Sequence, residues 1–154
     1  MRRIYVILMV SVSLGGTGIK PAYSQSATSG FYVIINSKVN CANEVNTLTG
    51  HGSFCLPNVP VITSDEFESI GEITRDRDRS IKYLELTLSQ EGFTILRTLA
   101  GRLPDTRLAL VVDNKVAGVF EGMSRYVNRI LPISGPIDSN EIEWIHNKIG
   151  KTKP

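Results

Sequence analysis

Cys41 and Cys55 are the residues of this chain with the clearest chemical potential. An even number of cysteines at this spacing is typical of a disulfide in an exported protein, and the bridge would close a segment rich in Asn, Thr and Gly. A redox or metal pair is the alternative, but there is no Cys-x-x-Cys motif and His51 is the only nearby ligand. We therefore expect one structural disulfide.

Residues for catalysis are sparse. Nucleophilic catalysis needs a base beside the nucleophile, yet the two histidines, His51 and His146, lie in no recognisable motif. The motifs Gly-x-Ser-x-Gly and His-Glu-x-x-His and the phosphate-binding glycine loops are absent. Glu141 and Glu143 do not face each other on a helix, because they are two residues apart. We expect no enzyme, no cofactor and no metal site, unless a cleft brings several carboxylates together.

Two loops carry residue types that are typical of protein interfaces. Residues 76–79 read Asp-Arg-Asp-Arg and predict a charged tip, which is either a solvated turn or a recognition loop. Its two carboxylates would make a poor calcium site. Residues 122–128 predict a second loop with Met, Arg and Tyr, which are enriched at interfaces, although a loop tyrosine also packs at the rim of a core. The candidate partner-binding residues are Arg77, Arg79, Met123, Arg125 and Tyr126.

The N-terminus, residues 1–24, predicts a cleavable signal peptide. Arg2 and Arg3 precede an apolar run, Ile4 to Leu14, that is shorter than the ~20 residues needed to span a bilayer. We expect cleavage after Ser24 and a periplasmic or secreted protein without stable membrane insertion. An uncleaved N-terminal anchor is the alternative.

The charge of the chain does not favour nucleic acid as a partner. The full sequence has 17 Lys and Arg against 15 Asp and Glu. Three of the 17, namely Arg2, Arg3 and Lys20, would leave with the signal peptide, so the mature chain would be close to neutral. The basic character therefore belongs to the targeting segment, and nothing in it indicates binding to nucleic acid or anionic membranes.

Residues 25–30 predict a disordered leader, residues 31–150 a single domain and residues 151–154 a tail. Within the domain, residues 31–35 predict a strand and residues 36–53 a loop. Thr63 and Glu66 form a capping box that predicts a short helix through Ile70, followed by a strand over residues 71–75.

The most informative segment runs from residue 81 to residue 120. Leu84, Leu86 and Leu88 alternate with polar residues, which predicts a half-buried strand. Ser89 is a good N-cap for the amphipathic helix that follows and that stops before Pro104. An apolar run over residues 107–113, a turn at residues 113–115 and a second run to residue 120 predict a hairpin. A strand over residues 129–133 and a helix capped by Asp138 close the chain; its buried stripe is Ile142, Ile145 and Ile149.

This segment resembles the head subdomain of the first periplasmic domain of SecD and SecDF. The matching residues are Thr87-Leu88-Ser89-Gln90-Glu91-Gly92 and Leu108-Ala109-Leu110-Val111-Val112-Asp113-Asn114-Lys115-Val116, with Asn114 in place of the usual Gly. The resemblance covers residues 55–149. SecD proteins also have several membrane spans and a Gly-Leu-Asp-Leu-x-Gly-Gly segment, which this sequence lacks.

The resemblance implies an α+β fold, with an antiparallel or mixed sheet of about five strands and two main helices packed on one face. It implies a non-enzymatic interaction module whose partner is an unfolded client or another protein of the cell envelope. An inhibitor or immunity-type protein that blocks an envelope enzyme is the alternative function.

Overall fold

A computed structural model describes residues 27–36, 41, 43–76, 81–134 and 139–150. The fold is α+β, as expected, but its strands form three antiparallel sheets rather than one sheet of about five strands. In chain order the elements are β1 (Gly30–Val33), β2 (Glu44–Asn46), β3 (Ser53–Cys55), β4 (Ile62–Thr63), η1 (Ser64–Glu66), β5 (Phe67–Ile70), β6 (Thr74–Asp76), β7 (Ile81–Leu88), α1 (Gln90–Arg102), β8 (Leu108–Val112), β9 (Lys115–Phe120), η2 (Met123–Arg125), β10 (Ile130–Ser134) and α2 (Ser139–Gly150).

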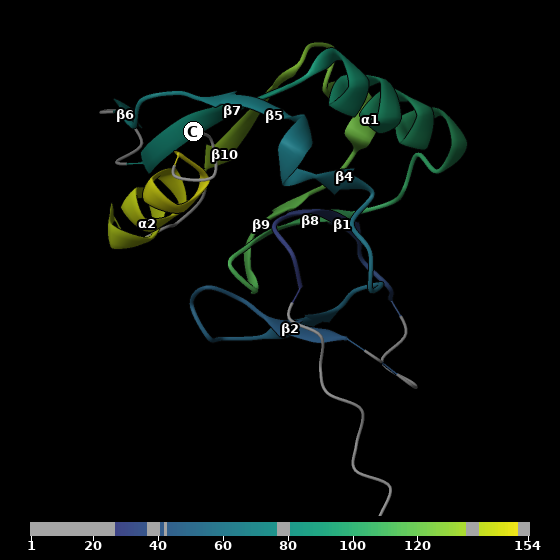
Figure 1. Cartoon of the computed structure of the whole chain (residues 1–154), viewed down its shortest axis with the longest axis horizontal. Helices are drawn as coiled ribbons and strands as arrows, with labels where there is room; N and C mark the ends of the chain where they lie inside the picture. The colour runs from purple at the N-terminus through teal and green to yellow at the C-terminus, as the bar shows by residue number, and fades with distance from the viewer. Residues whose placement is uncertain (1–26, 37–40, 42, 77–80, 135–138, 151–154) are drawn as a thin grey trace, which may run out of the picture.

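The central sheet has the strand order β4-β1-β8-β9, and the second sheet has the order β10-β7-β5, with β6 also paired to β7. Strands β2 and β3 form a separate pair, here called the disulfide hairpin. Figure 1 shows the central sheet in the middle, the disulfide hairpin below it and β5, β7 and β10 above it. The helices do not share one face of one sheet: α2 packs on β7, β5 and β8, and α1 packs beside β4, β7 and η2.

The central sheet is buried on both faces, because one core packs on each of them. Side chains of a strand point alternately to the two faces, so a strand can contribute to both cores. On β8, Leu108 and Leu110 point into the main core, which also includes the apolar faces of β7 and α2. Ala109 and Val111 point the other way, into a smaller core beneath the disulfide hairpin. All five residues of β8 are therefore buried, which explains why this segment reads as a continuous apolar run.

The strand and helix of residues 81–102 form as predicted. Leu84, Leu86 and Leu88 lie on the buried face of β7, and Ser89 begins α1. The Ser89 hydroxyl accepts a hydrogen bond from the Gly92 backbone N–H at 3.0 Å. This bond satisfies one of the backbone donors that the first turn of a helix leaves unpaired.

Replacing Ser89 with Ala should lower the free energy of unfolding by about 1 kcal/mol, because the Gly92 N–H loses its acceptor. Urea unfolding followed by circular dichroism measures this change. Ser89→Thr keeps a hydroxyl at the cap and should stay within a few tenths of a kcal/mol of the native protein. Equal losses in both variants would show that the cap bond is not the cause.

The β8–β9 turn holds the N-terminal segment and α2 in place. Asp113 and Asn114 both have positive φ, 47° and 60°, as a tight two-residue hairpin turn requires. The Asn114 side-chain oxygen accepts a hydrogen bond from Ala27 N–H at 2.8 Å, and Lys148 of α2 reaches Asp113 at 2.6 Å. Ala27 is buried and Gly30 begins β1, so residues 27–30 differ from the disordered leader that the sequence suggested.

The prediction of a helix from Thr63 to Ile70 is wrong beyond its first turn. The Thr63 hydroxyl does bond the Glu66 carboxylate, and residues 64–66 form a single 3-10 turn. The chain then becomes strand β5, because Phe67 pairs with Leu88 and its side chain enters the main core. The next strand, β6, covers residues 74–76 rather than 71–75.

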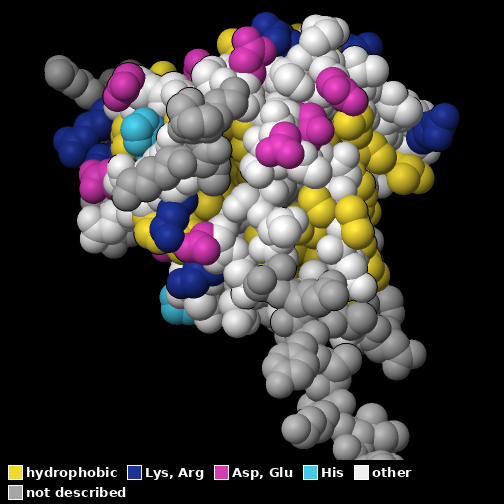
Figure 2. All heavy atoms as spheres, viewed as in Figure 1, with side chains coloured by type: hydrophobic (Ala, Val, Ile, Leu, Met, Phe, Trp, Pro, Cys, Tyr) yellow, Lys and Arg dark blue, Asp and Glu magenta, His cyan; other side chains and the backbone are white. Residues whose placement is uncertain are grey.

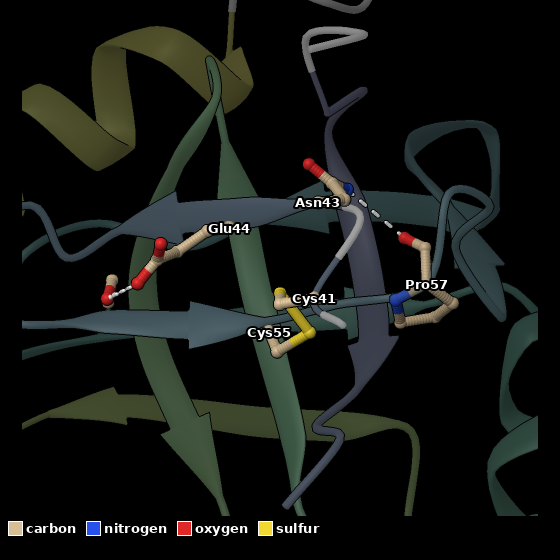
Figure 3. Close-up of a disulfide and its surroundings, with 6 residues drawn as sticks. Cys41, Asn43, Glu44, Cys55 and Pro57 are labelled. Atoms are coloured by element: carbon tan, nitrogen blue, oxygen red, sulfur yellow. Dashed lines mark hydrogen bonds between the residues drawn. A yellow bond between two sulfur atoms is a disulfide. The ribbon is translucent and has the colours of Figure 1, made fainter. Parts of the chain in front are cut away.

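The predicted disulfide is present between Cys41 and Cys55, with a Cα–Cα distance of 5.6 Å (Figure 3). The expected loop over residues 36–53 is corrected in part, since it contains β2 and the first residue of β3. Asn43 is buried and donates a hydrogen bond to the Pro57 carbonyl at 3.2 Å. The disulfide hairpin packs on the lower face of the central sheet in the view of Figure 1.

Candidate interaction surface

The loop of residues 122–128 connects β9 and β10, and Gly122 and Met123 determine the conformation of its first part. Gly122 has a φ of 60°, and a Cβ there would lie 3.2 Å from Arg125 Nε, so a glycine suits this turn. Met123 is only 1% exposed and packs in the main core. The prediction that Met123 is an exposed contact residue is therefore wrong.

Tyr126 anchors the other end of the loop. Its ring packs edge-to-face on Phe120, with the centroids 6.0 Å apart, and Phe120 in turn contacts Phe31. Burial raises the pKa of Tyr126, and the neighbouring Arg125 guanidinium opposes this rise. Tyr126 is thus a rim-packing residue, and the part of it that stays accessible is held in a fixed position.

Above these anchors the loop presents a positive and an apolar group to solvent. Arg125 is exposed, and Val127 is 74% exposed, the largest value among the exposed large hydrophobic side chains of the described residues. Ile130, the first residue of β10, is 39% exposed. Sequence reasoning missed both Val127 and Ile130. For Ile130 a signal exists, because it alternates with the buried Leu131 and Ile133 and must therefore face outward.

The loop leads directly into β10, so it adjoins the outer face of the second sheet, which is the face directed away from the main core. Ile130 is the first residue on that face. The register pairs Ile130 with Thr87 and Ser134 with Tyr83, and all of these side chains point away from the core. At the far end of this face a depression of about 120 Å³ is lined by Asp76, Ile81, Tyr83, Pro132 and Ser134. The outer face therefore runs from the 122–128 loop to Asp76, where the expected charged tip begins.

Arg77 and Arg79, the two other predicted contact residues, lie outside the described residues. The structure brings Arg125 and Tyr126 together on one loop, and it places Asp76 at the opposite end of the same sheet face. The part of the chain that is described thus supports one surface between the two predicted loops.

Arg129 fixes the base of the loop across the end of β7. Its guanidinium bonds the Glu68 carboxylate on β5 and also donates to the Leu88 carbonyl at 3.3 Å. Because β5 and β10 flank β7 on opposite sides, this side chain links both edges of the second sheet. Arg129 thus connects the base of the loop to β5 and to the end of β7.

Metal-ligating side chains do not converge in the described residues. No group of three or more His, Cys, Asp or Glu side chains in that part of the chain could hold a metal ion. His51 is exposed on the disulfide hairpin, whereas His146 lies on α2. Within the same residues no helix is both long and apolar enough to cross a membrane.

Comparison with known proteins identifies the fold. Neither a protein-family model nor a curated protein matches this chain. It is similar to a solved structure of SecDF, described as a membrane component that enhances protein export, with a TM-score of 0.58 and 15% identity. That match covers 82% of this chain and 63% of the SecDF chain.

A crystal structure of SecDF in a super-membrane-facing form is also similar, with a TM-score of 0.56 and 15% identity. The match covers 82% of this chain but 19% of that one. At such low identity the likeness establishes the fold alone. The resemblance to SecD and SecDF expected from the sequence is confirmed at that level.

Proposed function

We propose that this protein is a non-enzymatic module of the cell envelope that binds unfolded segments of other polypeptides. The observation that carries the proposal is the fold, which is similar to that of SecDF, a membrane component that enhances protein export. A module of such a component has polypeptide in transit as its natural ligand. Fold alone does not fix function, so the surface must also suit this ligand.

The outer face of the second sheet suits an unfolded polypeptide. The exposed Ile130 lies on this face, and the loop that leads into β10 carries the exposed Val127 and Arg125 and the half-buried Tyr126. Aromatic and arginine side chains are enriched at protein interfaces, and clustered exposed apolar side chains mark interaction sites. An exposed surface of this kind can bind apolar stretches that a folded protein would bury.

The disulfide supports the proposed location. Disulfides persist in oxidising compartments such as the bacterial periplasm or the cell exterior, and Cys41 is bonded to Cys55 here. The predicted signal peptide, residues 1–24, would bring the chain to such a compartment. Its cleavage after Ser24 is tested by mass spectrometry of the protein purified from the envelope.

Replacing Val127 with Asp should weaken binding of an unfolded chain about tenfold, because a contact of about 1.4 kcal/mol is lost. The ligand would be a secreted protein that is reduced and carboxymethylated so that it stays unfolded, and fluorescence anisotropy would give the Kd. Val59→Asp is the matched control, since Val59 is 71% exposed but lies in the segment between β3 and β4.

The native protein should not bind the folded form of the same ligand. Failure to bind the unfolded form would refute the proposed function. Retention of one stoichiometric enzyme from an envelope extract, with no affinity for unfolded chains, would instead establish the inhibitor role.

A further inference from the structure

A second concave feature lies on the opposite edge of the second sheet from β10. It is a groove of about 220 Å³ between β5 and the C-terminal end of α2. Its lining includes Phe67, Glu68, Ser69 and Ile70 of β5 and Ile149 and Gly150 of α2. The groove is thus bounded by an edge strand on one side and by a helix on the other, and its floor is mainly apolar.

The edge strand offers backbone groups to a ligand. The Gly71 N–H donates to the Glu85 carbonyl at 2.7 Å, so the backbone groups of Gly71 point toward β7. Because the direction alternates along an antiparallel strand, those of its neighbour Ile70 point away from β7. Among the backbone bonds of the described chain none joins Ile70 to a group outside the sheet, so its N–H and C=O are available at the edge.

The other edge of this sheet, β10, lacks a backbone hydrogen-bond donor at its middle residue. Pro132 of β10 stands opposite Glu85, whose backbone groups already face β5. The Pro132 nitrogen therefore points outward, where it has no hydrogen to donate. Strand addition is blocked at the middle of β10 and left open on β5, beside the groove.

The charges around the groove favour a basic ligand. Two exposed acids, Asp65 and Glu72, flank the lining residues of β5, whereas the carboxylate of Glu68 in the lining is already paired with Arg129. The groove also meets the end of α2 at Gly150, where a helix carries a partial negative charge. In the view of Figure 2, several acidic side chains lie near the middle of the molecule, with exposed apolar side chains beside them.

We propose that this groove binds an extended segment of a client polypeptide, in which apolar residues alternate with Lys or Arg, as an added strand on β5. In an extended chain alternate side chains point to opposite sides. The apolar ones would contact Phe67, Ile70 and Ile149, and the basic ones would approach the acidic rim. The mode is strand addition, in which main-chain hydrogen bonds supply affinity and side-chain pockets supply specificity. The inference rests on the proposed function and names the ligand segment.

The test uses a fluorescent ten-residue peptide of alternating Lys and Val, with the mature chain, residues 25–154. Gly150→Leu should weaken its binding at least tenfold, because a Cβ at Gly150 lies 4.0 Å from Ile70 Cγ2 and a larger side chain would fill the groove. Gly101→Leu is the matched control, since nothing lies within 4 Å of a Cβ there and it should leave the Kd unchanged.

Charge reversal tests the acidic rim separately. Glu72→Lys should weaken binding of the Lys-Val peptide severalfold at low salt and less at high salt. Asp105→Lys makes the same charge change at an exposed site after α1 and should have no effect. A Glu-Val peptide and a Lys-Gly peptide should bind the native protein at least tenfold more weakly than the Lys-Val peptide.

The outcomes separate this inference from the proposed function. If unfolded chains bind but Gly150→Leu leaves the Kd of the Lys-Val peptide unchanged, the groove is refuted and the function stands. If no unfolded chain binds, both are refuted. The final experiment uses a variant that ends at Gly150. If the peptide binds only after residues 151–154 are removed, the proposal is overturned, because those residues would then be the native occupant of the groove.

Discussion

Replacing Leu110 with Ala is expected to lower the free energy of unfolding by about 4 kcal/mol, in the upper half of the range for buried leucines. Leu110 is fully buried in the main core at the middle of β8. Its neighbours across the strands are Phe31 and Gly118. Because Gly118 has no side chain to move into the space, the cavity should remain largely unfilled. Urea unfolding by fluorescence measures the loss.

Leu103→Ala is the control for the same change of side chain at the surface. Leu103 follows α1 and is 49% exposed, so its truncation should cost less than about 1 kcal/mol. A cost for Leu110→Ala no larger than that of Leu103→Ala would mean that the central sheet is not packed on both faces as described.

Replacing both Cys41 and Cys55 with Ser should cost about 3 kcal/mol, because the disulfide restricts the unfolded chain. The two residues are 14 positions apart, a separation at which loop closure is worth about that much. For a domain of this size the melting temperature should fall by about 10 °C. Differential scanning calorimetry at matched protein concentration gives both quantities.

The reductant experiment controls for the serine side chains. Adding dithiothreitol should destabilise the native protein by the same amount and should leave the Cys41→Ser/Cys55→Ser variant unchanged. A native protein that is insensitive to the reductant while the variant is destabilised would assign the effect to packing around Cys55, which is itself buried.

Elements that depend on interactions between neighbouring residues could be predicted from the sequence. The Ser89 cap, the alternation of β7 and the tight turn at Asp113 and Asn114 each depend on residues within a few positions of one another. The same holds for the buried stripe of α2, where Ile142, Ile145 and Ile149 are all buried. These segments carried the resemblance to SecD, and the fold comparison agrees with it.

Elements that depend on contacts between residues far apart in the sequence could not be predicted. The side chains of Thr63 and Glu66 do bond each other, but Thr63 caps no backbone N–H, and the pairing of Phe67 with Leu88 ends the helix after one turn. The disulfide hairpin has strands of only three residues, and what holds it is the packing of Val45 and Leu56 on the lower face of the central sheet. Such packing leaves no periodic pattern in a short segment.

The candidate surface shows the same division. Residue type singled out Arg125, which is exposed, and Tyr126, which is half-buried, but it could not reveal that Met123 turns inward to the main core. Methionine suits both a core and an interface, so its type alone does not decide between them. Val127 carries no sequence signal at all, because a single apolar residue in a polar loop is common on protein surfaces.

Pro132 has a consequence for stoichiometry. Chains that associate edge to edge can form a fibre only if each copy offers two competent edges, one for each neighbour. The second sheet has one edge that can accept a strand and one that Pro132 caps. Copies of this chain would therefore not propagate edge to edge through the second sheet, because the edge that remains on each copy is the one that Pro132 caps.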